Sequence, residues 1–167
     1  NVKEYLSMVA PLPFPSRFIY KGEIAKELKK ENITIDEYSI FINTDQLFKA
    51  YSTYLKDGEA KPPYDEIFGV EFIKIENDNK VLIAWGWYGL SKFEKQIPKI
   101  NIFRGIRLRK GNIQIGAEDA LVGFFKEERS NYYFIGEIHA IHSELIPNAR
   151  RDYFNENDVA ILFKRKL

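Results

Sequence analysis

Cysteine is absent from all 167 residues of the chain. This absence excludes disulfide bonds, zinc sites built on cysteine, and a catalytic thiol. It is also typical of proteins that live in a reducing compartment, so we expect a cytoplasmic protein.

Long apolar runs and a strong excess of one charge are lacking too. The longest apolar run, Val81–Trp85, is far shorter than the roughly 20 residues that cross a bilayer. No signal-peptide pattern opens the chain, and we expect no membrane association. The net charge is only +1, whereas a dedicated nucleic-acid-binding domain is usually more basic. Nucleic acid is therefore not an expected partner.

Two common functional signatures are missing as well. A Walker-type phosphate loop would need a lysine after a glycine frame, but Gly116 is followed by Ala117 and Glu118. The only two histidines, His139 and His142, fall at the end of a predicted strand, and no third metal ligand stands out nearby. We therefore expect no metal site and no nucleotide loop of this kind.

The sequence instead shows an ordinary soluble composition, with 45% hydrophobic and 29% charged residues, which suits one domain with its own core. An extended segment is expected at 10–15, which contains three prolines. Helices are predicted at 22–32, at 117–125, from 149 and at the C-terminus, and strands at 38–42, 70–75, 80–88, 104–108, 113–115 and 132–141. This order predicts an α+β fold, with a mostly antiparallel or mixed sheet and helices on one face.

Residues 144–152 read ELIPNARRD and carry the sharpest functional signal. Pro147 ends the preceding strand, Asn148 is typical of a helix cap, and Asp152 suits a first helical turn. Arg150 and Arg151 are then predicted at a helix start, where a double arginine would make a strong anion site. The alternative is structural, with Arg150 paired to an acidic neighbour, either Glu144 or Asp152.

Period-two spacing places two further pairs on strand faces. Trp85 and Trp87 share a face and are expected in the core, although an apolar client or interdomain surface is the alternative. Arg107 and Arg109 also share a face. We expect a half-buried strand with one solvent-exposed face, and the alternative is a basic stripe that holds a partner or nucleic acid.

Residues 134–152 resemble part of the middle domain of the ninety-kilodalton heat-shock chaperones. Phe134–Gly136 matches a strand of that domain, and Ser143–Pro147 matches the turn after it, with the proline displaced by one position. Asn148, Arg151 and Asp152 match the asparagine, arginine and acidic positions that follow. The chain is also similar to the second domain of bacterial chaperone-like ATPases of the same superfamily, through 10–14, 85–89, 105–116 and the arginine pair; the resemblance covers most of 5–158.

This resemblance implies a middle, transducer-type domain of a heat-shock-protein-90-like ATPase of the GHKL superfamily. Arg151 would contact the phosphate of ATP bound by a neighbouring N-terminal domain, and Asn148 would position the loop. Arg150 is the weaker candidate, because the chaperone pattern has serine at its position. ATP and magnesium would belong to the full-length protein. The implied fold resembles domain two of a ribosomal small-subunit protein and contains a left-handed βαβ crossover.

Residues 1–20 are expected to be an extended segment leading in from an upstream nucleotide-binding domain, and 21–167 to be the middle domain itself. The chain begins at Asn1 and closes in a predicted helix, which suggests a fragment of a longer protein. The Asp-x-Gly-x-Gly turn of the superfamily is absent, so we expect no ATPase activity from this fragment alone. Expected partners are the upstream domain and a client protein, and the full protein could dimerise. The alternative function is a non-catalytic protein- or nucleic-acid-binding module.

Overall fold

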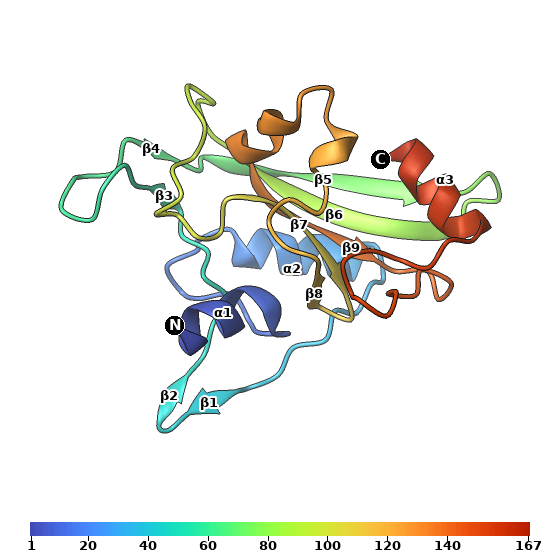
Figure 1. Cartoon of the computed structure of the whole chain (residues 1–167). Helices are drawn as coiled ribbons and strands as arrows, with labels where there is room; N and C mark the ends of the chain where they lie inside the picture. The colour runs from blue at the N-terminus through green and yellow to red at the C-terminus, as the bar shows by residue number, and fades with distance from the viewer.

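A mixed five-stranded sheet with the strand order β5-β6-β9-β7-β8 forms the centre of the molecule in the computed structural model, which describes residues 1–167 (Figure 1). β7 and β9 are parallel and the other neighbours are antiparallel. The strand bounds are β5 Gly69–Glu76, β6 Leu82–Leu90, β7 Gly105–Lys110, β8 Ile113–Ile115 and β9 Ile135–Ala140. The predicted hairpins at 70–88 and 104–115 are confirmed.

Two small antiparallel pairs lie outside this sheet. They are formed by β1 (Phe41–Ile42) with β2 (Asp45–Gln46), and by β3 (Tyr54–Leu55) with β4 (Asp65–Glu66). The strand predicted at 38–42 therefore contributes only its last two residues to a sheet.

Three α-helices and two 3₁₀ helices complete the fold: α1 Val2–Val9, α2 Lys21–Lys30, η1 Val122–Phe124, η2 Glu128–Tyr133 and α3 Asp158–Lys166. Asn1 caps α1 and Asn157 caps α3, each with its side-chain oxygen accepting from a backbone N–H. None of these helices combines the length and the apolar character that crossing a membrane requires. The predicted helices at 22–32 and at the C-terminus are confirmed. The expectation of an extended segment over 1–20 is wrong for Val2–Val9, which form α1.

Helices cover both faces of the sheet. On one face, Phe163 of α3 and Leu121 pack with Leu108 and Ile138 of the sheet. On the other, Ile24 of α2 packs with Trp87, and α1 lies on the same side (Figure 1). The α+β class with a mixed sheet is confirmed, but the expectation of helices on one face is wrong. Consecutive residues of β6 and β9 are buried, and successive side chains of a strand point to opposite faces, so both faces of the sheet must be covered.

The connection from β7 to β9 passes over the face that carries Leu121, through β8, η1 and η2. Phe134 packs on this face, and its carbonyl accepts a hydrogen bond from Gly105 of β7. In a strand of L-residues running upward, a residue whose side chain points at the viewer directs its N–H and C=O to the right. β7 therefore lies to the right of β9, and the crossover is left-handed, as the resemblance predicted. About 98% of such crossovers have the opposite hand.

The prediction of a helix at 117–125, within this crossover, is wrong. The segment forms turns and the three-residue η1 instead. Gly123 lowers the helix propensity, and Phe125 already adopts an extended conformation. Leu121, Phe124 and Phe134 pack on the sheet from this irregular backbone. The strand predicted at 132–141 likewise begins only at Ile135, because Tyr132 and Tyr133 belong to η2.

Candidate functional site

Arg150 and Arg151 lie in a tight turn rather than at the start of a helix. Pro147 and Phe154 form an antiparallel bridge, and the N–H of Asn148 donates to the carbonyl of Tyr153 at 2.9 Å. Arg151 has a φ of +56°, in the left-handed region, which reverses the chain. The helix predicted from Ala149 is therefore wrong, and the next helix begins only at Asp158.

Asn148 holds this turn with its side chain. Its Nδ2 donates to Oδ1 of Asp152 at 2.7 Å, and its Oδ1 accepts from the N–H of Asp152 at 3.3 Å. Such side-chain-to-backbone bonds favour turns over regular structure. Asn148 is not a helix cap, but it does fix the loop that carries Arg150 and Arg151.

Both arginine side chains of the turn are exposed and form no ion pair. No carboxylate oxygen lies within 4.0 Å of Arg150 or Arg151. The alternative in which Arg150 pairs with Glu144 or Asp152 is thus not formed, since the Asp152 carboxylate bonds to Asn148 instead. Two adjacent guanidinium groups that are unpaired and accessible are suited to bind an anion.

The turn borders an open groove of about 820 Å³. α1 contributes one wall through Tyr5 and Met8, the edge strand β8 contributes Ile113, and the turn contributes the two arginines. The groove also contains acidic side chains, namely Glu4, Glu118, Asp119 and Asp152. The groove therefore combines the two arginines with apolar and acidic side chains.

Arg107 and Arg109 share one face of β7, as predicted, but that face is buried. Arg107 is 4% exposed and Arg109 is fully buried. Arg109 donates to the carbonyl of Asn112 at 2.8 Å and to that of Met8 at 2.6 Å, so it ties α1 to the sheet. Both the solvent-exposed face and the basic stripe are therefore wrong expectations. N-terminal segments cover the sheet here, a tertiary arrangement that strand periodicity does not encode.

A buried ionic cluster lies under those N-terminal segments, and its centre is Glu137 in the middle of β9. The Glu137 carboxylate pairs with Lys49 at 2.8 Å and with Nε of Arg109, and it accepts a hydrogen bond from Nε1 of Trp87 at 3.1 Å. Lys49 also donates to Asn112 at 2.9 Å. The cluster connects the loop after β2, strand β7 and strand β9 in one buried network.

Charge interactions set the protonation of this cluster. Burial alone would raise the pKa of Glu137, but Lys49 and Arg109, aided by His139, hold it well below its usual range. Burial lowers the pKa of His139, so this imidazole is neutral near pH 7. Sequence reasoning missed Lys49 and Glu137. The available signal was a lone carboxylate inside the apolar run 134–141.

The remaining candidates have structural roles. Trp85 and Trp87 are 1% and 0% exposed, which confirms the core expectation and removes the aromatic client surface. His139 lies 3.5 Å from Glu137, whereas His142 caps its own loop by accepting from the N–H of Glu144. No group of three or more His, Cys, Asp or Glu side chains is arranged to hold a metal.

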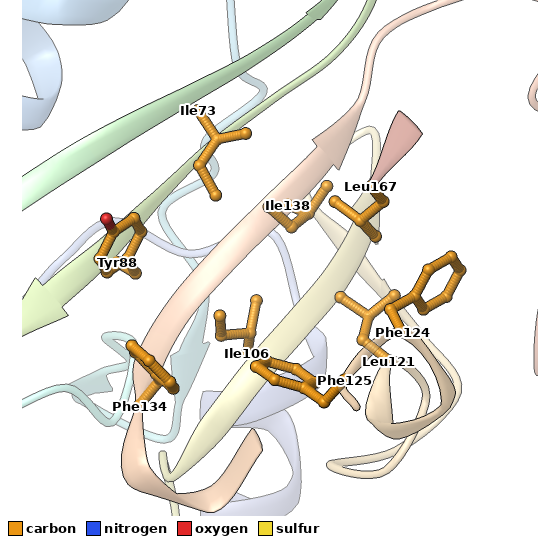
Figure 2. A pocket seen from close by; sticks show the side chains of 9 residues that line it. All are labelled: Ile73, Tyr88, Ile106, Leu121, Phe124, Phe125, Phe134, Ile138 and Leu167. Carbon is orange, nitrogen blue, oxygen red and sulfur yellow. The ribbon is translucent and has the colours of Figure 1, made fainter. Parts of the chain in front are cut away.

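A pocket of about 320 Å³ lies on the face of the sheet that α3 covers, opposite to the face that carries Trp87 (Figure 2). All nine residues that line it are hydrophobic. They come from four strands, from the crossover and from the C-terminal residue: Ile73, Tyr88, Ile106, Leu121, Phe124, Phe125, Phe134, Ile138 and Leu167. None of these side chains is charged, so the pocket suits a mainly apolar partner.

Among these features, the turn at 148–152, called the arginine turn below, is the one that fits a nucleotide phosphate. Its two guanidinium groups can donate hydrogen bonds to a phosphate that another domain or molecule holds. The groove beside them contains no glycine loop that could cradle a triphosphate. The residues present therefore suit one contact to a phosphate and not a complete nucleotide site. Searches against protein-family models and against curated proteins find no match to this chain.

Proposed function

We propose that this chain is the middle, transducer-type domain of a heat-shock-protein-90-like chaperone ATPase. In this role Arg151 reaches the terminal phosphate of ATP held by an N-terminal domain of the same protein. The observation that carries the proposal is the turn at 148–152, which presents two exposed arginines without an acidic partner.

The fold supports the same proposal. A left-handed crossover is rare enough that it distinguishes between fold families, and it belongs to the fold that the resemblance implies. The crossover also leads directly to the site, since β9 ends a few residues before the turn. The local motif and the chain topology are the two observations that support the proposal.

In the proposed reaction, this chain contributes the positive charge of Arg151 and the turn that positions it. ATP, with its magnesium ion, would supply the phosphoryl group that is transferred to water. The guanidinium of Arg151 would lie against the charge that builds up on that group, and it would do so only when the two domains close. A contact made mainly in the transition state raises kcat more than it raises affinity. Asn148 would keep the turn in the orientation that this contact requires.

Substitution of Arg151 in the full-length protein tests the proposal. Arg151→Ala should lower ATP turnover by about 100-fold or more, because arginines in this role contribute on the order of 10³–10⁵ to phosphoryl transfer. Nucleotide affinity should change little. Arg129→Ala is a matched control, since Arg129 is exposed and lies outside the groove. Turnover that is equal in both variants would contradict the proposal.

The second candidate is a protein-binding module without a link to ATP. The apolar pocket of Figure 2 favours it, because hydrophobic concave surfaces often receive a partner's side chains. Nucleic-acid binding through Arg107 and Arg109 is not part of this candidate, since both are buried. A Phe125→Glu variant, which places a charge at a half-buried position of the pocket, should abolish partner binding under this candidate and leave the circular-dichroism spectrum unchanged.

A further inference from the structure

A chain of hydrogen bonds runs from the buried sheet to the backbone of Arg151. Nη1 of Arg107 donates to Oε1 of Gln114 at 3.2 Å, and Nε2 of Gln114 donates to the carbonyl of Gly116 at 3.1 Å. The N–H of Gly116 then donates to the carbonyl of Arg151 at 2.7 Å. Three consecutive bonds therefore connect β7, β8 and the arginine turn.

The inner end of this chain is fixed. Nη2 of Arg107 donates to the carbonyls of Ile102 and Arg104 at 2.7 and 3.0 Å, and its Nε donates to Arg104 at 3.1 Å. Arg107 is 4% exposed and Gln114 is 7% exposed. Since buried hydrogen-bonded side chains are costly to displace, Arg107 gives Gln114 a rigid anchor.

The outer end leaves no room for adjustment. Gly116 has a φ of +69°, and a Cβ added there would lie 2.9 Å from Cβ of Ala120 and 3.0 Å from the carbonyl oxygen of Asp152. The arginine turn therefore packs directly on the Gly116 backbone. A shift of Gly116 would be transmitted to the turn, because its N–H bonds to the carbonyl of Arg151 and its backbone lies close to the carbonyl of Asp152.

We propose that Gln114 is a positioning residue, which sets the placement of the Arg151 turn by holding Gly116. Its amide is suited to the task, since the oxygen accepts from Arg107 while the nitrogen donates to Gly116. This inference rests on the proposed function for its catalytic consequence. Its structural part, a coupling between Gln114 and the turn, stands independently.

Gln114→Glu separates the two bonds of the amide. A glutamate keeps the shape and the acceptor for Arg107 but cannot donate to the carbonyl of Gly116 when ionised. In the present chain, amide hydrogen exchange measured by NMR should become about tenfold faster at Gly116, whose N–H bonds to Arg151. Exchange at Ile138, in the centre of the sheet, should be unchanged. Gln46→Glu, at an exposed position, is the matched control.

In the full-length protein, Gln114→Glu should lower kcat about tenfold with KM for ATP unchanged, while the control retains wild-type kcat. Unchanged exchange at Gly116 would overturn the coupling. Faster exchange with an unchanged kcat, in a protein where Arg151→Ala abolishes turnover, would overturn the positioning role. If Arg151→Ala itself leaves turnover intact, the proposed function fails, whereas the exchange result still decides the coupling.

Discussion

The ammonium of Lys49 donates hydrogen bonds to both carboxylate oxygens of Glu137, at 2.9 and 2.8 Å, and the two side chains are 2% and 0% exposed. These residues lie 88 positions apart in the chain. The pair fastens the loop after β2 to the centre of the sheet, beneath the N-terminal segments. Lys49 alone would be buried without compensation, whereas Glu137 without Lys49 would still pair with Arg109.

Lys49→Met should lower the free energy of unfolding by about 1.5–3 kcal/mol, the usual value of a hydrogen bond to a charged group, because Glu137 keeps Arg109 as a partner. Urea unfolding followed by circular dichroism measures this change. Lys95→Met is the control, since Lys95 pairs with Asp57 at the surface and both are 44% exposed, so its effect should stay within about 1 kcal/mol. Equal losses in both variants would contradict the argument.

His139 should make the free energy of unfolding depend on pH, and its pKa shift sets the sign. Burial lowers the pKa of His139 from its ordinary value of 6.5, so below pH 6.5 the unfolded chain binds a proton that the folded chain resists. The free energy of unfolding should thus fall as the pH drops below about 6.5. His139→Gln removes this group and should flatten the profile between pH 7 and the folded pKa. A profile identical to that of the wild type would show that His139 does not titrate in this way.

Trp87 is expected to be a large contributor to stability. The ring is fully buried, packs against Phe14, Phe18 and Tyr51, and donates to Glu137 through Nε1. Trp87→Ala should cost about 3–5 kcal/mol in unfolding free energy, and thermal unfolding will show a lower Tm.

Phe41→Ala serves as the control for Trp87→Ala, because Phe41 is 56% exposed and should change stability by no more than about 0.5 kcal/mol. An unchanged Tm for Trp87→Ala would mean that this ring is exposed in solution.

Regular alternation made part of this fold predictable. The hairpin of β5 and β6 and that of β7 and β8 follow from period-two runs separated by turn residues. The burial of Trp87 follows from the same period. The left-handed crossover could not come from pattern rules, which favour the opposite hand, and it was predicted only through the family resemblance.

The site was predicted less completely, for physical reasons. Asn148 followed by two arginines looks like a helix start, but the side chain of Asn148 bonds to Asp152 and closes a turn instead. Local sequence does not reveal the bridge between Pro147 and Phe154 that favours this turn. The burial of Arg109 was missed because its partner Glu137 lies on β9, which neighbours β7 in the sheet but is far from it in the sequence.

Under the proposed function, this chain should not bind ATP by itself. Titration of the isolated chain with ATP and magnesium in a calorimeter should give no specific heat of binding, because neither a glycine-rich phosphate loop nor an Asp-x-Gly-x-Gly turn occurs in the sequence. A micromolar site on this chain alone would contradict the two-domain proposal. An ATPase of the GHKL superfamily that contains its nucleotide domain provides the positive control.

The two arginines of the turn should differ in function. Arg151→Lys should restore little of the turnover lost in Arg151→Ala, because an ammonium is a point charge and lacks the planar fork that binds two phosphate oxygens. Arg150→Ala should have the smaller effect, since the family pattern has serine at this position, and since only Arg151 adopts the left-handed backbone that defines the turn. Steady-state turnover of the full-length variants at saturating ATP measures both effects. A larger loss for Arg150→Ala than for Arg151→Ala would transfer the phosphate contact to Arg150, while full rescue by lysine would show that charge alone suffices at this position.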